Sequence, residues 1–196
     1  MNEVLINLST KSDRLCGCTA PFICKHCPNN WECCVCVEPP ELTACDIQQL
    51  KAAVPDQWGD VIANHPQYPD GPLKVLARAS SGHCRFFNIN NSTCDIYPYR
   101  PLLCRLFPLD VCFDSGKYFW IVYHEFCSLA KTMHGKTVVR VLDQLENLLA
   151  LFSEEELSFY ATKAVRQFSL FRKGEWKKLA EMKSHNDIYG KGRTRC

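Results

Sequence analysis

The chain has 196 residues, of which 14 are cysteine, 46% are hydrophobic and 22% are charged, and its formal net charge at pH 7 is +2. A chain of this length can bury a hydrophobic core of its own, so it does not need cysteines to stabilise a miniprotein. No apolar run approaches the roughly 18 residues of a membrane span, and the near-neutral charge gives no electrostatic argument for nucleic acid. We therefore expect a soluble protein that binds neither membranes nor nucleic acid.

The start of the sequence bears on the role of the cysteines. It begins Met1-Asn2-Glu3 and offers only a short apolar run over residues 4–8. A signal peptide needs a basic start and an apolar stretch of about 7 to 15 residues, so we expect a cytoplasmic protein. In a reducing cytoplasm, closely spaced cysteines bind metal more often than they form disulfides. The composition therefore favours metal ligation over a disulfide framework.

Half of the cysteines lie in the first 40 residues, among prolines and asparagines that break regular structure. These cysteines are Cys16, Cys18, Cys24, Cys27, Cys33, Cys34 and Cys36. We interpret this segment as loops that are held by something other than secondary structure.

The next segment predicts a short helix. Thr43 and Asp46 have the spacing of a capping box, and apolar residues recur at helical intervals after them. This pattern predicts a helix over residues 44–54. A further helical turn is expected near residues 58–63, followed by a loop over residues 65–72 that contains proline and glycine.

Two β-hairpins are predicted in the middle of the chain. The first joins residues 84–87 to residues 94–97 through an asparagine-rich turn. The second joins residues 109–113 to residues 117–124 through Asp114-Ser115-Gly116, a turn signal between aromatic and β-branched runs.

The last third of the chain has a helical pattern and no cysteine before Cys196. Apolar residues recur every three or four positions over residues 137–151, which predicts one helix. Ser153 and Glu156 form a capping-box pattern for a second helix that reaches about residue 171. The apolar stripe of this second helix is Leu157, Tyr160, Ala161, Ala164, Phe168 and Phe171.

A shorter third helix is predicted from the spacing of Trp176, Leu179 and Met182, and the basic tail over residues 184–196 is expected to be mobile. We therefore predict a single domain over residues 1–196 with an irregular α+β fold. Its cysteine-rich part, residues 16–130, would consist of metal-stapled loops and two small hairpins. The helical part, residues 137–183, would pack against it.

The cysteine spacing indicates which metals fit. Thiolates are soft ligands that select zinc, copper(I) or iron–sulfur clusters, and Cys24-x-x-Cys27 lets two sulfurs converge on one centre. The adjacent Cys33 and Cys34 point to opposite sides of an extended backbone, which favours two metals or a larger cluster over one tetrahedral ion. Cys33-x-x-Cys36 offers an alternative, a four-thiolate zinc site of Cys24, Cys27, Cys33 and Cys36 with Cys34 in the core.

Three further motifs carry a family resemblance. They are Cys84-Arg85-Phe86-Phe87, Cys94-Asp95-Ile96-Tyr97 and the run from Tyr99 to Pro108, which contains Arg100-Pro101 and Cys104-Arg105. Together with the earlier pairs, they resemble the YkgJ family of zinc- or iron-chelating domains, which carries a CxxCxxCC-type signature, over about residues 22–130. The resemblance implies as ligands Cys24, Cys27, Cys33, Cys34, Cys84, Cys94, Cys104 and Cys127. The cysteines outside its pattern are Cys16, Cys18, Cys36, Cys45, Cys112 and Cys196.

The residues around these cysteines favour iron–sulfur over zinc. Eight thiolates suit two four-thiolate sites, or one cluster with additional thiols, and the double cysteine with its aromatic neighbours suits a bulky, shielded cluster. We expect one or two iron–sulfur clusters of the [4Fe-4S] type, with a redox or cluster-dependent role, and zinc as the alternative metal. No sequence feature identifies a substrate or a protein partner.

Two other classes of function stay open. A structural zinc module would present the C-terminal helices to a partner protein. The second class is an enzyme, because flagellin lysine N-methylases contain a similar cysteine-rich region. Against this class, the sequence has no glycine-rich nucleotide-binding loop. Whether the protein is an enzyme is therefore left open.

Charged residues and histidines adjoin several of these cysteines. Arg100 and Arg105 flank Cys104, where a guanidinium would lower thiol pKa values and offset negative charge. The alternative is that these arginines pair with carboxylates such as Asp95 or Asp110. For His26 and His83, an exposed imidazole or one that contacts the ligands from outside is expected rather than a ligand.

Overall fold

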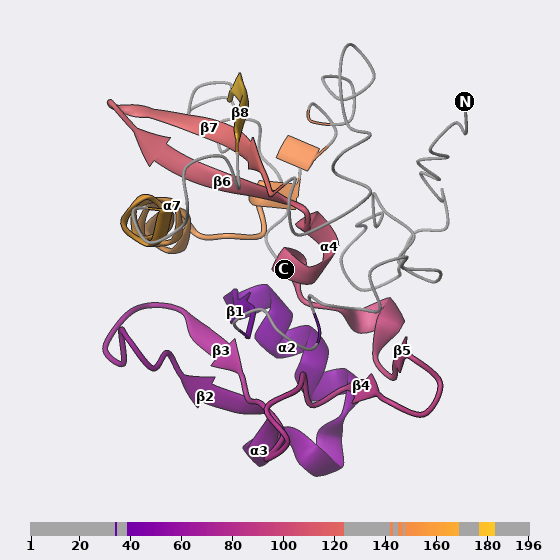
Figure 1. Cartoon of the computed structure of the whole chain (residues 1–196). Coiled ribbons are helices and arrows are strands. Elements are labelled where there is room, and N and C mark those ends of the chain that lie inside the picture. The colour runs from indigo at the N-terminus through magenta and orange to yellow at the C-terminus, as the bar shows by residue number, and fades with distance from the viewer. Residues whose placement is uncertain are drawn as a thin grey trace, which may run out of the picture.

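The computed structural model describes residue 34 and residues 39–123, 142, 145–146, 148–168 and 177–182 (Figure 1). Its strands are β1 (Glu41–Leu42), β2 (Ile62–Asn64), β3 (Lys74–Leu76), β4 (Phe87–Asn88), β5 (Thr93–Cys94), β6 (Leu109–Asp114), β7 (Lys117–Val122) and β8 (Lys177–Glu181). Its α-helices are α2 (Ala44–Ala53), α3 (Trp58–Val61), α4 (Leu102–Leu106) and α7 (Glu154–Phe168), and short 3-10 turns cover Pro55–Gln57 and Tyr97–Tyr99.

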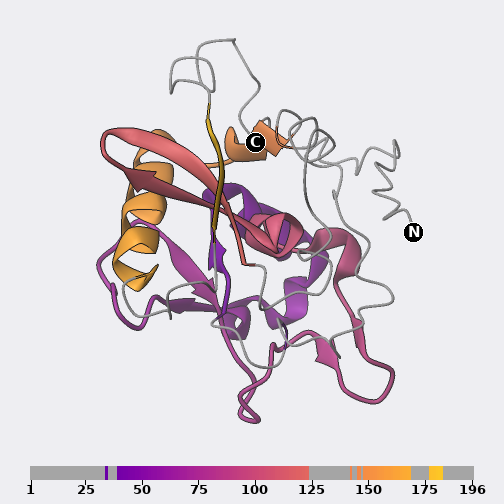
Figure 2. The same ribbon diagram turned by 45° about the horizontal axis from the view of Figure 1, so that its top comes forward.

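The described elements form two groups with α4 between them. In one group α2 and α3 lie beside the small sheet β1-β3-β2. In the other group α7 lies along the sheet β6-β7-β8 (Figures 1 and 2). All strand pairs are antiparallel. The mixture of helices and small antiparallel sheets agrees with the predicted α+β class. The division of the chain into domains stays a prediction.

The predicted capping box starts α2. The Thr43 hydroxyl accepts a hydrogen bond from the backbone N–H of Asp46 at 3.0 Å, and the Asp46 carboxylate accepts one from the backbone N–H of Thr43 at 3.0 Å. The helix ends at Ala53, one residue before the predicted end. The helical turn expected near residue 58 is α3.

The sheet β1-β3-β2 is absent from the sequence prediction. Its strands have only two or three residues, too few for the alternation of apolar and polar side chains that identifies a strand. Val75 of β3 pairs with Glu41 on one side and Ala63 on the other, so three distant segments meet. One hydrophobic cluster lies here, composed of Leu42, Leu50, Val61, Leu76, Phe86 and Ile96.

Both predicted hairpins are present. The first is shorter than expected, with Phe87 of β4 opposite Cys94 of β5. The second pairs β6 with β7 from Leu109↔Val122 to Asp114↔Lys117. Its two turn residues both have positive φ, 51° at Ser115 and 81° at Gly116, as a two-residue turn that follows the strand twist requires.

The second predicted helix is α7. The Ser153 backbone N–H donates to Glu156 at 2.7 Å, and the Glu156 N–H donates to the Ser153 hydroxyl at 3.1 Å, which confirms the capping box. Leu157 and Ala161 are buried as predicted, in the core between α7 and the sheet β6-β7-β8. Phe171 lies outside the described residues. Of the helix predicted over residues 137–151, the described positions from Leu142 to Leu149 are helical.

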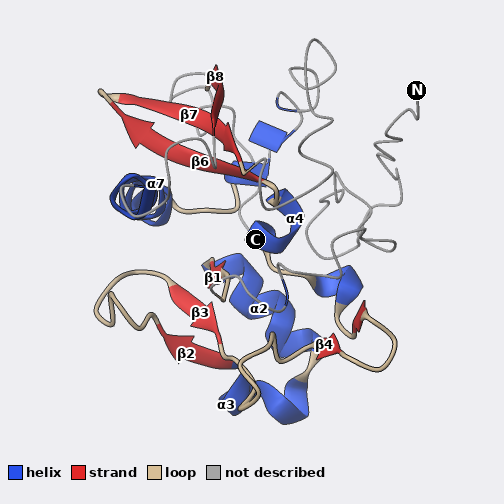
Figure 3. Cartoon of the chain, in the orientation of Figure 1, coloured by secondary structure: helices blue, strands red, loops and turns tan. Residues whose placement is uncertain are grey.

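The prediction of a third helix around Leu179 is wrong, because residues 177–181 form β8 (Figure 3). Ala180 pairs with Trp120 of β7, and a register shift follows between Trp120 and Ile121. The edge of β7 offers unpaired backbone groups that a neighbouring segment can satisfy only as a strand. Leu179 packs against the main core from this strand, so tertiary pairing overrides the helical spacing.

In the described part of the chain, every helix falls short of the length and apolar character that crossing a bilayer requires.

Candidate metal centre

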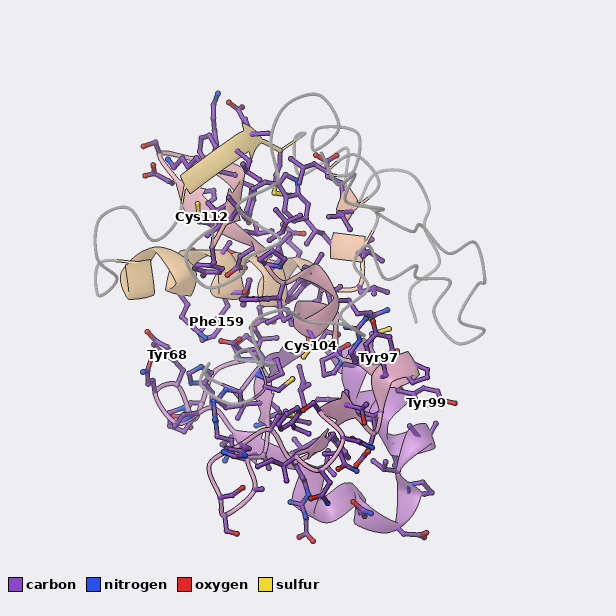
Figure 4. The ribbon with its side chains drawn as sticks, turned by 45° about the vertical axis from the view of Figure 1, so that its right-hand side comes forward. Tyr68, Tyr97, Tyr99, Cys104, Cys112 and Phe159 are labelled. Atoms are coloured by element: carbon purple, nitrogen blue, oxygen red, sulfur yellow. The ribbon has the colours of Figure 1, made fainter. Side chains whose placement is uncertain are left out.

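Cys104 lies on α4, a short helix whose start is held by a residue from α2. Pro101 precedes the helix and has no side chain that can cap it. Instead the backbone N–H of Leu102 donates to Asp46 Oδ1 at 2.8 Å, although the two residues are 56 positions apart. Leu102 and Leu106 are fully buried on either side. The position of α4, and with it that of Cys104 (Figure 4), therefore depends on α2.

Arg105 is paired with a buried carboxylate. Its Nη2 atom lies 3.7 Å from Asp46 Oδ1, and both side chains are buried. Burial raises the pKa of Asp46, while the charge of Arg105 and the hydrogen bonds from Thr43 and Leu102 oppose this shift. Arg105 therefore pairs with Asp46, and the alternative prediction that it pairs with Asp95 or Asp110 is wrong. The Nε atom of Arg105 is buried and has no hydrogen-bond partner among the residues that the structure describes.

Two of the predicted ligands, Cys84 and Cys94, lie near each other at the hairpin β4–β5, and the backbone of a third, Cys34, is hydrogen-bonded to that of Cys84. The backbone N–H of Cys84 donates to the carbonyl of Cys34 at 2.7 Å, across 50 residues of sequence. Burial, with a smaller contribution from the nearby Cys84, raises the pKa of the Cys94 thiol to about 11. Cys84 and Cys94 also pack against the cluster that contains Phe86. These thiols therefore lie in a half-buried, partly apolar environment.

Arg100 places a positive charge near Cys94. Its guanidinium is buried and lies 3.8 Å from the centre of the Tyr97 ring, and its Nε atom donates to the Tyr97 carbonyl at 3.1 Å. The charge of Arg100 lowers the pKa of Cys94 and so opposes the effect of burial. Figure 4 shows Tyr99 directed outward. Arg100 thus acts on a predicted ligand, whereas Arg105 is engaged with Asp46.

The remaining predicted ligands, Cys24, Cys27, Cys33 and Cys127, lie outside the described residues, as do Cys36 and His26. Within the described ranges, His, Cys, Asp and Glu side chains nowhere gather in a group of three or more that could hold a metal ion. The complete eight-cysteine set and its Cys36 alternative stay predictions. The described members, Cys34, Cys84, Cys94 and Cys104, are thiols and not disulfides, so their donor chemistry fits zinc or iron.

Cys45 and Cys112, which the motif pattern leaves out, differ from these thiols. Cys45 is buried in α2 and forms a disulfide. Cys112 is buried on β6, well away from Cys104 (Figure 4). Metal ligation therefore does not account for every cysteine, although the composition favoured it over disulfides.

His83 is half-buried beside the same hairpin. Its ring lies 6.4 Å from the ring of Phe87 in an edge arrangement. The role expected for His83, outside the ligand set, stays a prediction.

Comparison with known families identifies the cysteine-rich part. The family model described as "CxxCxxCC: Putative zinc- or iron-chelating domain" matches residues 23–128. The chain belongs to this family. The match confirms the resemblance inferred from the motifs, and it includes Cys34, Cys84, Cys94 and Cys104. The helix α7 and the strand β8 lie beyond the matched range.

The chain is also similar to one protein from a methanogen. Uncharacterized protein MJ0661 from Methanocaldococcus jannaschii is 28% identical over 86 residues, which are 44% of this chain and 47% of that protein. The aligned part thus spans about half the length of this relative. No solved structure matches the chain.

The sequence did not reveal the wider role of Asp46. Its spacing from Thr43 identifies a capping residue of α2, and this is confirmed. Its second contact, with the first N–H of α4, joins residues 56 positions apart. No sequence signal marks that contact, because the capping box already accounts for an acidic residue at this position.

Proposed function

We propose that this member of a zinc- or iron-chelating family binds an iron–sulfur cluster of the [4Fe-4S] type, or two, through cysteine thiolates. The proposed ligands are Cys24, Cys27, Cys33, Cys34, Cys84, Cys94, Cys104 and Cys127. The observation that carries the proposal is the close approach of Cys84 and Cys94 at the hairpin β4–β5, with the backbone of Cys34 hydrogen-bonded to that of Cys84. When bound, a cluster would supply one-electron transfer.

The surroundings of these thiols support a shielded centre. Phe86 is buried and belongs to the hydrophobic cluster against which Cys84 and Cys94 pack. An apolar shell limits solvent access, and the nearby Arg100 charge offsets negative charge on thiolates. Both features suit a cluster whose potential depends on burial and on neighbouring charge. Zinc remains the alternative metal, and the same thiols would bind it.

The test is purification of the full chain without oxygen, followed by iron, zinc and acid-labile sulfide analysis and an optical spectrum. We expect a coloured protein with iron and sulfide in equal amounts. Colourless protein with stoichiometric zinc and no iron would overturn the cluster proposal and leave zinc ligation.

Substitutions test the ligand assignment separately. Cys84→Ser and Cys94→Ser should lower the bound metal or alter its spectrum, because each removes a thiolate. Cys112→Ser is the matched control, since Cys112 lies on β6 outside the predicted set. If the control loses as much metal as the two variants, the assignment fails.

A further inference from the structure

One buried face of α7 carries polar side chains, whereas the buried face of a helix is usually apolar. Glu156, Tyr160 and Lys163 are spaced four and three residues apart, so they share this face, and all three are buried. Each contacts a different part of the molecule: Glu156 contacts α2, Tyr160 contacts Asp110 of β6, and Lys163 contacts β1. The helix therefore docks through specific polar contacts as well as through its apolar residues.

The contact between Glu156 and α2 joins the starts of two helices. Glu156 Oε2 accepts from the N–H of Ser153 at 2.7 Å, and Oε1 accepts from the N–H of Ala44 at 2.9 Å. Ala44 is the first residue of α2, and the first N–H groups of a helix have no acceptor within that helix. One carboxylate therefore caps both α7 and α2. The residues in its contact with α2, Glu156 and Ala44, are 112 positions apart in the sequence.

Asp46 repeats this arrangement between α2 and α4. Its Oδ2 atom accepts from Thr43, at the start of α2, and its Oδ1 atom accepts from Leu102, the first residue of α4. Cys104 follows Leu102 by two residues on that five-residue helix. The side chains of Glu156 and Asp46 thus connect α7 to α2 and α2 to Cys104.

We propose that these two carboxylates, which we call the cap relay, couple the docking of α7 to metal binding at Cys104. Glu156 is then a positioning residue for a predicted ligand, although it lies beyond the family match at residues 23–128. This inference rests on the proposed function. Because coupling is reciprocal, loss of the Glu156 contact weakens metal binding, and bound metal stabilises the docked α7.

The first experiment compares Glu156→Ala with Ser153→Ala in the full chain. Both substitutions weaken the capping box of α7, but only the first removes the acceptor for Ala44. With zinc as the probe and a competing chelator, Glu156→Ala should bind about tenfold more weakly than Ser153→Ala. In the cobalt-substituted protein, its thiolate-to-cobalt absorption should also fall, because Cys104 is displaced.

Alkylation of Cys104 gives a direct readout of its position. In zinc-loaded protein, the peptide that contains Cys104 should react with iodoacetamide faster in Glu156→Ala than in Ser153→Ala. Equal zinc affinity, equal cobalt spectra and equal alkylation in the two variants would overturn the relay.

A measurement on the wild type covers the case in which Glu156→Ala fails to fold. Hydrogen exchange over residues 154–168 should become slower when zinc is added, and unchanged exchange would overturn the coupling. Binding of neither zinc nor cobalt by the wild type would overturn the relay, whereas the proposed function is overturned separately, by an anaerobic preparation that contains neither iron nor zinc. Normal binding with unchanged exchange overturns the relay alone.

Discussion

The side-chain nitrogen of Lys163 lies 2.9 Å from Nε2 of His65, and the carboxylate of Glu41 contacts both groups. All three side chains are buried. His65 Nδ1 accepts hydrogen bonds from the N–H groups of Gln67 and Tyr68 at 3.1 and 3.2 Å, so Nδ1 carries no proton and Nε2 faces the other two groups. This cluster joins α7 to β1 and to the loop after β2.

Replacement of Lys163 by methionine should strongly destabilise the protein. It would leave the Glu41 carboxylate buried without its cation, a change that costs about 3 kcal/mol of unfolding free energy. The matched control is Lys117→Met, which breaks an exposed pair with Glu181 and should cost less than about 1 kcal/mol. Urea unfolding of both variants measures the difference. Equal losses of stability would contradict the importance of the buried cluster.

The buried carboxylate of Asp110 should give the protein a pH-dependent stability. It accepts hydrogen bonds from the hydroxyls of Tyr123 and Tyr160 and from the N–H of Val111. Burial nevertheless raises its pKa, although these hydrogen bonds oppose the shift. A group whose pKa is raised on folding stabilises the folded state below its unfolded pKa, and this contribution is lost as pH rises through the folded pKa.

The variant Asp110→Asn isolates this contribution. The free energy of unfolding of the wild type minus that of the variant should fall as pH rises from about 4, the ordinary value for aspartate, toward 7. Urea unfolding of both proteins at several pH values and matched metal content gives this difference. The other buried carboxylate, Asp46, is present in both proteins, so its pH-dependent contribution cancels. A difference that does not change with pH would argue against the raised pKa.

Cys112 should react slowly with alkylating agents in the folded protein. Burial raises the pKa of its thiol from an ordinary 9.0 to about 11, so the reactive thiolate is about 100-fold scarcer at pH 8. Mass spectrometry after iodoacetamide treatment of metal-loaded protein measures this rate. The same reaction in guanidinium is the control, and there Cys112 should be labelled readily. Fast labelling in the folded state would contradict the burial of Cys112.

Gly116→Ala should lower stability by about 1 kcal/mol, because Gly116 has a φ of +81° that disfavours a Cβ atom. Gly59→Ala is a matched control within α3. A Cβ atom at either position meets nothing within 4 Å, so the two variants differ in backbone conformation and not in packing. Thermal unfolding should show a lower Tm for Gly116→Ala only. The reverse order would contradict the turn geometry.

Features that depend on neighbours in the chain were determined by the sequence. The capping boxes of Thr43 and Ser153 each join residues three positions apart. The hairpin β6–β7 follows from a two-residue turn between β-forming runs. The order of the cysteine motifs likewise identified the family, because spacing within a motif is itself a property of the sequence.

Features that depend on distant partners were decided only by the tertiary structure. Residues 177–181 have the spacing of a helix, yet they form a strand because the edge of β7 supplies backbone partners. One oxygen of Glu156 accepts from Ala44, 112 positions away in the sequence, and one oxygen of Asp46 accepts from Leu102, 56 positions away. A local pattern shows that a carboxylate caps its own helix. It does not show which other helix start will lie beside the remaining oxygen, because folding of the whole chain brings the two together.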